Sequence, residues 1–350
     1  MRIASLIAIV LLHGIPGQTQ TRGLEFNDSH FHLTNYIQEG TDIRAFLKIM
    51  GDTTGRVALF GIPLQQQWSY RVDGERAPTY YLNTDAPLYY YSFTDAWIAK
   101  AYQSLPQEQR ARFDPMITGF NPTDMYAADH IRRVLRTFPG VFTGIGEFTI
   151  HKEFVSAKVA GEVASLQDPA LGRILDFAAE VGLVVLIHND IDVPFAKEGS
   201  PPAHLEQFKA VLIRHPRTTI IWAHTGMGRV VRPIQDHAAH IAGILSDPAY
   251  AHVNFDISWD VVAKYIVENP AATKITADLI NRYSDRFLFG TDEVAPADRA
   301  AYTKVFYQYA PLWSLLDAEA SRKVRIANYE RIFDGARRRV RLWESTHTDR

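Results

Sequence analysis

The sequence predicts an α/β protein of the (β/α)8 class, a TIM barrel, and three observations support this fold class. Short apolar runs rich in β-branched residues alternate with longer amphipathic segments from residue 25 onwards. Several of the amphipathic segments begin with helix-capping residues. No internal repeat, low-complexity tract or Gly/Ser-rich linker divides the chain, so residues 22–350 are expected to form one domain.

Eight runs have the composition of buried strands. They cover residues 25–31, 56–59, 115–120, 141–148, 183–188, 219–224, 252–257 and 287–291. Helical periodicity is expected between them, over residues 124–137, 169–181, 204–215, 230–245, 260–283 and 296–309.

Two of the predicted helices carry start signals of their own. Asp168 stands before Pro169 as a cap before a first-turn proline, and Asn121-Pro122-Thr123 precedes the helix over 124–137 in a similar way. A doubly wound sheet is the alternative architecture, but no G-x-G-x-x-G follows any predicted strand.

Residues 1–21 have the layout of a secretory signal peptide. Met1 and Arg2 give a positive start, residues 3–12 are apolar, and residues 13–21 break the run with Gly, Pro and polar residues. A buried strand or a misassigned start codon is the alternative interpretation. The run is too short to span a bilayer, so we expect an exported protein, periplasmic or secreted, with no membrane contact after removal of the signal.

Composition narrows the classes of partner. The chain has 37 basic and 39 acidic residues, so it lacks the charge excess of proteins that bind long nucleic acids. It has no cysteine and therefore forms no disulfides. We expect a small-molecule substrate.

A long aromatic-rich insert, residues 61–93, follows the second predicted strand. Loops after barrel strands lie over the face that carries active sites, which favours a lid or pocket wall. A packing subdomain or a contact in a homo-oligomer is an equally supported alternative.

Ionisable side chains lie at the ends of five predicted strands. His30 and His32 end the first, Glu147 the fourth, His188 the fifth and His224 the sixth, and Asp292 follows the eighth. Taken singly, each of these residues is more often a hydrogen-bonded core or loop residue than a metal ligand. Together they would meet at one mouth of a barrel, where a bound cation makes their burial tolerable. Imidazole and carboxylate ligands without thiolates suit zinc, manganese, iron or nickel.

In this order on strands one, four, five, six and eight, these residues resemble the ligand set of the amidohydrolase superfamily. The resemblance extends from about residue 26 to Asn328–Asp334 and includes I-I-W-A-H-T-G-M-G and L-F-G-T-D. It implies a hydrolase with one or two divalent ions held by His30, His32, Glu147, His188, His224 and Asp292, with Asp292 also moving the proton of the attacking water. Where many members carry a carboxylated lysine this chain has Glu147, similar to the TatD-like branch; Lys152 lies too far beyond the strand to replace it.

Substrate contacts are less well defined. Arg229 could bind a carboxylate or phosphate, Trp259 could line the pocket, and His151 and Glu293 lie beside ligands. Asp256 and Asp260 could also face the pocket, but helix capping by Ser258 or Asp260 is the favoured interpretation there.

Three rival functions share the pattern. A metal-dependent decarboxylase would need one ion and has less use for Glu147. A TatD-like nuclease fits poorly with the near-neutral charge and the export signal. A non-catalytic exported binding protein has no evident need for Asp292.

Overall fold

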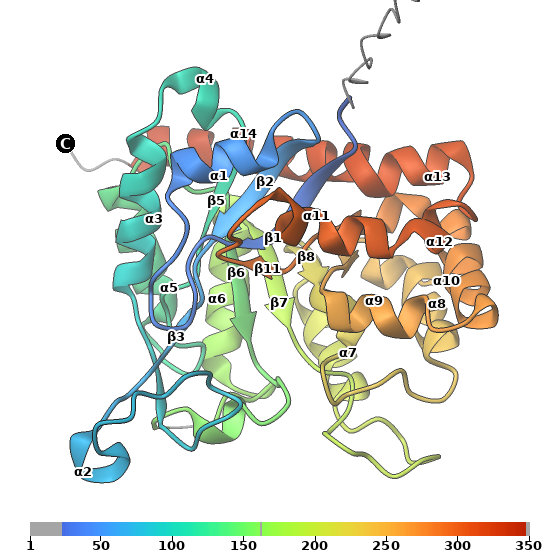
Figure 1. Cartoon of the computed structure of the whole chain (residues 1–350), viewed down its shortest axis with the longest axis horizontal. Coiled ribbons are helices and arrows are strands. Elements are labelled where there is room, and N and C mark those ends of the chain that lie inside the picture. Colours follow the sequence, from blue (N-terminus) through green and yellow to red (C-terminus); the bar gives the residue numbers. More distant parts are fainter. Residues whose placement is uncertain (1–22, 162, 348–350) are drawn as a thin grey trace, which may run out of the picture.

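In the computed structural model, which describes residues 23–161 and 163–347, parallel strands pair in one continuous sheet (Figure 1). The predicted signal segment lies outside the described residues. The order along the sheet is β10-β9-β8-β7-β6-β5-β2-β1-β11. The bounds are β1 Phe26–His32, β2 Thr54–Phe60, β5 Phe113–Ile117, β6 Gly144–Thr149, β7 Val184–His188, β8 Thr219–Trp222, β9 Val253–Ile257, β10 Phe287–Phe289 and β11 Glu293–Val294.

The sheet closes on itself through its last two strands. β10 pairs with β9, β11 pairs with β1, and only residues 290–292 separate β10 from β11. The Asp292 backbone N–H donates to the His30 carbonyl over 2.7 Å. Gly290 permits this close approach, because a Cβ at that position would lie 2.7 Å from the Cβ of His30. Of the predicted eighth strand, residues 287–289 form β10, and β11 follows beyond its predicted end. Together the two short strands complete the barrel, and the TIM-barrel prediction is confirmed.

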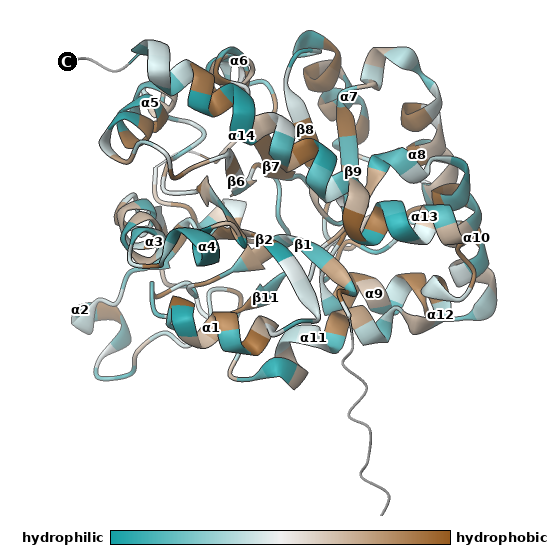
Figure 2. Ribbon diagram, turned by 90° about the horizontal axis from the view of Figure 1, so that it is seen from above, coloured by the Kyte–Doolittle hydropathy of each residue, from teal (hydrophilic) through white to brown (hydrophobic). Residues whose placement is uncertain are grey.

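Helices surround the strands on all sides (Figure 2). Their bounds are α1 Ile43–Met50, α3 Phe93–Gln103, α4 Gln107–Arg110, α5 Ala127–Thr137, α6 Pro169–Val181, α7 Leu205–Arg214, α8 His237–Ser246, α9 Asp260–Ile266, α10 Pro270–Arg282, α11 Arg299–Gln308, α12 Ala310–Trp313, α13 Ala318–Arg322 and α14 Asn328–His347. α6 has the predicted start: Asp168 accepts a hydrogen bond from the Ala170 N–H, Pro169 is the first helical residue, and left-handed Gly182 ends the helix.

Three helix predictions were wrong in detail. The segment 260–283 is two helices, because Pro270 has no N–H to continue α9 and the Asn269 side chain caps α10 instead. The segment 230–245 is helical only from His237, after a loop that contains Pro233. The Asn121 side chain accepts from the Thr123 N–H in a local turn rather than capping α5, which begins at Ala127.

The insert 61–93 forms a small layer of its own. β3 (Leu64–Gln66) and β4 (Leu88–Tyr90) pair antiparallel, and the short helix α2 (Tyr70–Asp73) projects at the lower edge of Figure 1. Leu64, Tyr81 and Leu88 pack against Val155 from the loop after β6. Lys158 of that loop donates to the carbonyls of Tyr81 and Thr84, which holds the insert against the barrel.

The opposite end of the barrel is closed by α14, whose Tyr329, Ile332, Phe333 and Ala336 pack against apolar side chains from inside the barrel. α14 and α2 accordingly lie at opposite ends of Figure 1. Within residues 23–161 and 163–347, no helix is both long and apolar enough to cross a membrane.

Candidate metal centre

Strand alternation carries the ionisable side chains into the barrel mouth. On β7, Val184 and Leu186 pack inside the barrel with α14, whereas Val185 and Ile187 belong to the outer core, so His188 faces inward. On β1, His30 and His32 share one face and Phe31 packs on the opposite face with Phe46 of α1. The H-F-H segment is therefore a strand with both imidazoles on the same side.

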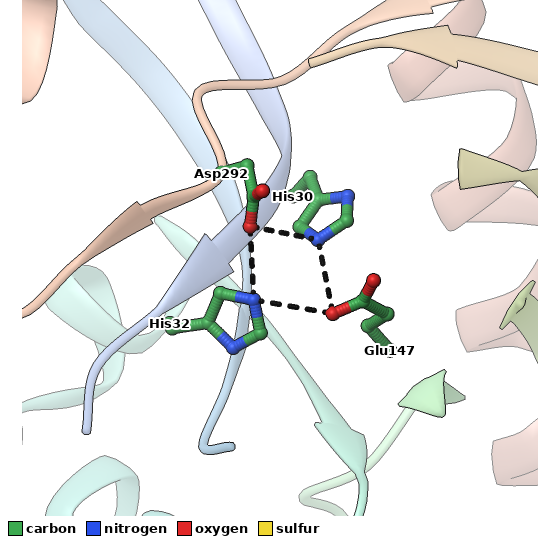
Figure 3. A group of neighbouring side chains, drawn as sticks. All are labelled: His30, His32, Glu147 and Asp292. Atoms are coloured by element: carbon green, nitrogen blue, oxygen red, sulfur yellow. Dashed lines mark hydrogen bonds and ion pairs between the residues drawn. The ribbon is translucent and has the colours of Figure 1, made fainter. Parts of the chain in front are cut away.

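Four side chains that each offer one ligand atom to a metal ion converge in a first group: His30, His32, Glu147 and Asp292 (Figure 3). Asp292 Oδ1 lies 3.2 Å from His30 Nε2 and 3.0 Å from His32 Nε2, and Glu147 Oε2 lies 3.7 and 3.5 Å from the same two nitrogens. Ligands about 2.1 Å from a tetrahedral zinc ion stand about 3.4 Å apart, so these separations match the edges of such a site.

The Nδ1 atoms of these two histidines already have hydrogen-bond partners. His30 Nδ1 donates to Asp256 Oδ2 over 2.9 Å, and His32 Nδ1 donates to the Gly61 carbonyl over 3.1 Å. A neutral imidazole that donates from Nδ1 has only a lone pair at Nε2. His30 Nε2 is buried without a hydrogen-bond partner. Lone pairs and carboxylate oxygens thus face one another, an arrangement that needs positive charge between them.

A second group shares Glu147. Its Oε1 lies 2.7 Å from His188 Nδ1 and 3.6 Å from His224 Nε2, while its Oε2 belongs to the first group. His188 Nε2 donates to Asp190 Oδ1 over 3.0 Å. The two oxygens of Glu147 are therefore divided between the two groups, as a bridging carboxylate requires, although the 2.7 Å contact has the length of a direct hydrogen bond.

Ser258 holds His224 in place. Its hydroxyl donates to Asp256 Oδ1 over 2.6 Å and accepts from His224 Nδ1 over 2.8 Å. His224 Nε2 is left buried without a hydrogen-bond partner, aimed at Glu147 and Asp292.

The electrostatics of the cluster favour added positive charge. Burial alone would raise the pKa of Asp292, but His30 and His32 hold it well below its usual range. Burial likewise opposes ionisation of Glu147, whose pKa is held well below normal by Lys152 and His188. Burial would lower the pKa of His30, yet Asp292 and Asp256 raise it well above normal. The ionised carboxylates attract either protons onto the imidazoles or a metal ion among them.

A cavity of about 120 Å³ opens above the first group. Its lining includes His32, Glu147 and Asp292 from the barrel and Arg229 and Trp259 from the loops after β8 and β9. The insert supplies Ile62, Pro63, Leu64, Tyr80 and Tyr81 to the same cavity. The insert is thus a wall of the pocket that contains the donor cluster.

Not every sequence candidate reaches this cavity. His151 stacks on His204 with ring centroids 3.8 Å apart and is absent from the lining formed by the described residues. Burial and His204 lower its pKa to about 4. Glu293 belongs to β11, whose backbone pairs with that of β1. Asp260 Oδ2 accepts a hydrogen bond from Lys304 Nζ.

Four residues of the centre escaped the sequence analysis or were misassigned. Ser258 and Asp256 are hydrogen-bonded to each other and support the histidines. The capping interpretation of Ser258 was wrong, because Trp259 is the N-cap residue of α9. Asp190 follows His188 at the i+2 spacing of a strand face, a signal that could have been used. Lys152 was set aside as too distant, but its Nζ lies 3.3 Å from Glu147 Oε1.

Comparisons with known proteins give the family and the fold of this chain. The model of the family described as amidohydrolase matches residues 28–335. No curated protein matches the chain. Among solved structures, a candidate 2-pyrone-4,6-dicarboxylic acid hydrolase from Pseudomonas putida has a TM-score of 0.55 and 13% identity over 89% of this chain and 98% of its own.

An amidohydrolase from Burkholderia multivorans with bound zinc has a TM-score of 0.52 and 14% identity over 88% of this chain and 99% of its own. At these identities the structural likeness shows the fold. The family match spans most of the chain, and from it we conclude that this protein belongs to the amidohydrolase family.

Proposed function

We propose that this amidohydrolase is a metal-dependent hydrolase that cleaves an ester, lactone, amide or related bond of a small molecule. The observation that carries the proposal is the set of buried acceptors around one point: two Nε2 lone pairs, Glu147 and Asp292 at mutual distances of 3.0 to 3.7 Å. The donor set, nitrogen and oxygen without sulfur, suits zinc, with manganese, iron or nickel as alternatives.

His30, His32, Glu147 and Asp292 would hold a first ion, and His188 and His224 a second one shared through Glu147. A divalent ion held there lowers the pKa of water from about 15.7 to about 7 and polarises the bond to be cleaved. Asp292 has one oxygen among the donors and lines the cavity, so we assign it to take the proton from water and return it to the leaving group.

The remaining residues fix this geometry. Asp256 and the Gly61 carbonyl hold the Nδ1 atoms of His30 and His32, so that both Nε2 atoms face the ion. Lys152 Nζ lies 3.3 and 3.4 Å from the two oxygens of Glu147 and keeps this carboxylate ionised. The decarboxylase and binding-protein alternatives have no comparable support, because a proton carrier and a divided carboxylate serve water attack. A nuclease would also use water attack, but the near-neutral charge of the chain disfavours a nucleic-acid substrate.

The test is metal content per chain, measured by inductively coupled plasma mass spectrometry, together with hydrolysis of ester, lactone and amide panels before and after chelation. We expect about two ions, falling to one or none in Glu147→Ala, with activity lost on chelation and restored by zinc. Glu206→Ala, which removes an exposed carboxylate on α7, is the matched control and should keep both ions.

One ion that is unchanged in Glu147→Ala would remove the bridging role and bring the decarboxylase forward. Activity that survives chelation would refute metal-dependent hydrolysis altogether.

A further inference from the structure

We propose that the pocket binds substrates that carry a carboxylate or phosphate group, and that Arg229, held by Tyr80 of the insert, is the residue that selects this group. The inference rests on the proposed hydrolase function for the reacting bond, but concerns a separate part of the pocket. It also gives the insert a role, as the element that sets substrate specificity.

The Arg229 guanidinium is fixed in position. Its Nη2 donates to the Tyr80 hydroxyl over 2.7 Å, and its carbon lies 5.1 Å from the Tyr80 ring centroid and 5.5 Å from that of Trp259. The backbone is fixed too, since the Arg229 N–H donates to Glu153 and its carbonyl accepts from the Tyr265 hydroxyl over 2.8 Å. A side chain held in this way loses little entropy on binding a ligand.

This guanidinium has no ion-pair partner among the described residues; burial would lower its pKa, but Tyr80 and Glu153 raise it. Its Nε is buried without a hydrogen-bond partner, and no carboxylate of the described residues lies within 4.0 Å of its nitrogens. Arg56 and Arg337, by contrast, both pair with the buried Asp114. An oriented cation with free donors, placed in the wall of a pocket, matches the planar oxygens of a carboxylate or phosphate.

The net charge of the lining points the same way. The acidic groups Glu147 and Asp292 are balanced by the basic groups Lys152 and Arg229, and the imidazole of His32 is neutral as a ligand. Any divalent ion added to this balanced set leaves the pocket positively charged. A negatively charged substrate is then attracted, and Arg229 orients it relative to the donor cluster.

Size and polarity limit the rest of the substrate. The cavity of about 120 Å³ is comparable to the roughly 150 Å³ cavity that accepts benzene in an engineered protein. Ile62, Leu64, Val155 and Trp259 give it apolar walls. The ligand class is therefore an acid of about one ring or a short chain, with the cleavable bond close to its anionic group.

The test is calorimetric titration of the zinc-loaded protein with benzoate, phenyl phosphate and the neutral analogue benzamide. We expect at least one anion to bind at least tenfold more tightly than benzamide, and this advantage to fall at least tenfold in Arg229→Gln. The tighter of the two anions identifies the group as carboxylate or phosphate. Arg232→Gln, which removes an exposed arginine three residues away, should leave binding within twofold of wild type.

Tyr80→Phe provides a second variant, because it releases the guanidinium without removing its charge; a loss of threefold or more is expected. Equal binding of the anion to wild type and Arg229→Gln would mean that it binds elsewhere, the metal included, and would overturn the proposal. Equal binding of benzamide and both anions would do the same. These titrations require no turnover, so a failure to hydrolyse any ester, lactone or amide would refute the proposed function and leave the anion site standing.

Discussion

Both ends of the barrel bury carboxylates, but the two ends satisfy them in different ways. At the end closed by α14, Asp114 is fully buried and accepts from Arg56 Nη2 over 2.7 Å, Arg337 Nη2 over 2.7 Å and the Tyr329 hydroxyl over 2.8 Å. At the mouth, Asp292 and Glu147 face imidazole nitrogens whose other ring positions already donate to partners. Both ends thus contain buried carboxylates, and the two ends differ in the side chains that these carboxylates face.

The difference separates a structural ion cluster from a reactive centre. Arginine cannot lose its proton, so Asp114 has permanent cationic donors and needs nothing further. At the mouth, Lys152 supplies one ammonium group to Glu147, but the neutral histidines can serve Asp292 and the rest of the cluster only if a proton or a metal ion supplies further positive charge. The closed end is thus complete within the chain, whereas the mouth is arranged to bind a cation.

The largest expected effect is at the mouth. Asp292→Asn removes the proton acceptor while keeping the shape of the side chain, so hydrolysis should fall about 10²- to 10⁴-fold. The measurement is kcat on the best substrate of the ester and lactone panels, with metal content and thermal melting recorded alongside. Full activity with metal still bound would show that Asp292 carries no proton.

The closed end should respond in stability instead. Asp114→Asn leaves Arg337 without its counter-charge and Arg56 with Asp334 alone, and because both arginines are partly exposed we expect a loss of about 2–3 kcal/mol in the free energy of unfolding. Urea unfolding measures this, with metal content unchanged. Asp129→Asn is the control: it breaks the surface pair with Arg132 and should cost under about 1 kcal/mol. Loss of metal in Asp114→Asn would contradict the division between the two ends.

A smaller effect is expected from the residue that supports His224. Ser258→Ala removes the hydroxyl between His224 and Asp256, and metal affinity should fall about 10- to 100-fold. Competition with a chelator of known affinity measures it, and Ser314→Ala on the exposed surface is the control. Unchanged affinity would mean that Asp256 alone orients the histidines.

The sequence was informative where function coincides with strand periodicity. His30, His32, Glu147, His188 and His224 follow apolar runs, and a parallel barrel brings such strand ends together whatever the loops do. The supporting residues were harder to identify, because Asp256-Ile-Ser258 before a helix has the composition of an ordinary cap. Its true role depends on His30 and His224, which are far away in the chain.

Loops were the other source of error. Lys152 contacts Glu147, and the insert lines the cavity, because of the paths that their loops take. The spacing of residues in the sequence does not predict such paths. The helix expected over 230–245 failed for a related reason: residues 230–236 are a loop, and α8 begins only at His237. Sequence periodicity describes elements, whereas the pocket wall is built from what connects them.

Asp95 of α3 is a third buried carboxylate, and among the residues that the structure describes it has neither an arginine nor an imidazole as a hydrogen-bond or ion-pair partner. It accepts from the backbone N–H groups of Thr118 and Gly119 over 2.8 and 3.0 Å. Burial raises its pKa from 3.8 to about 7 in spite of these hydrogen bonds. A buried acid without a cationic partner therefore holds a proton up to near-neutral pH.

The sign of the resulting pH dependence follows from proton counts. Between pH 4 and 7 the native state retains the Asp95 proton and the unfolded chain does not, so this group's contribution to stability is complete below pH 3.8 and is lost as the pH rises through 7. The slope is at most about 1.4 kcal/mol per pH unit. Urea unfolding of wild type and Asp95→Asn at pH 5, 6 and 7 should show stability falling more steeply with pH in the wild type. Parallel curves would mean that the two backbone donors keep Asp95 ionised, and that a carboxylate in this barrel needs no cation to stay charged.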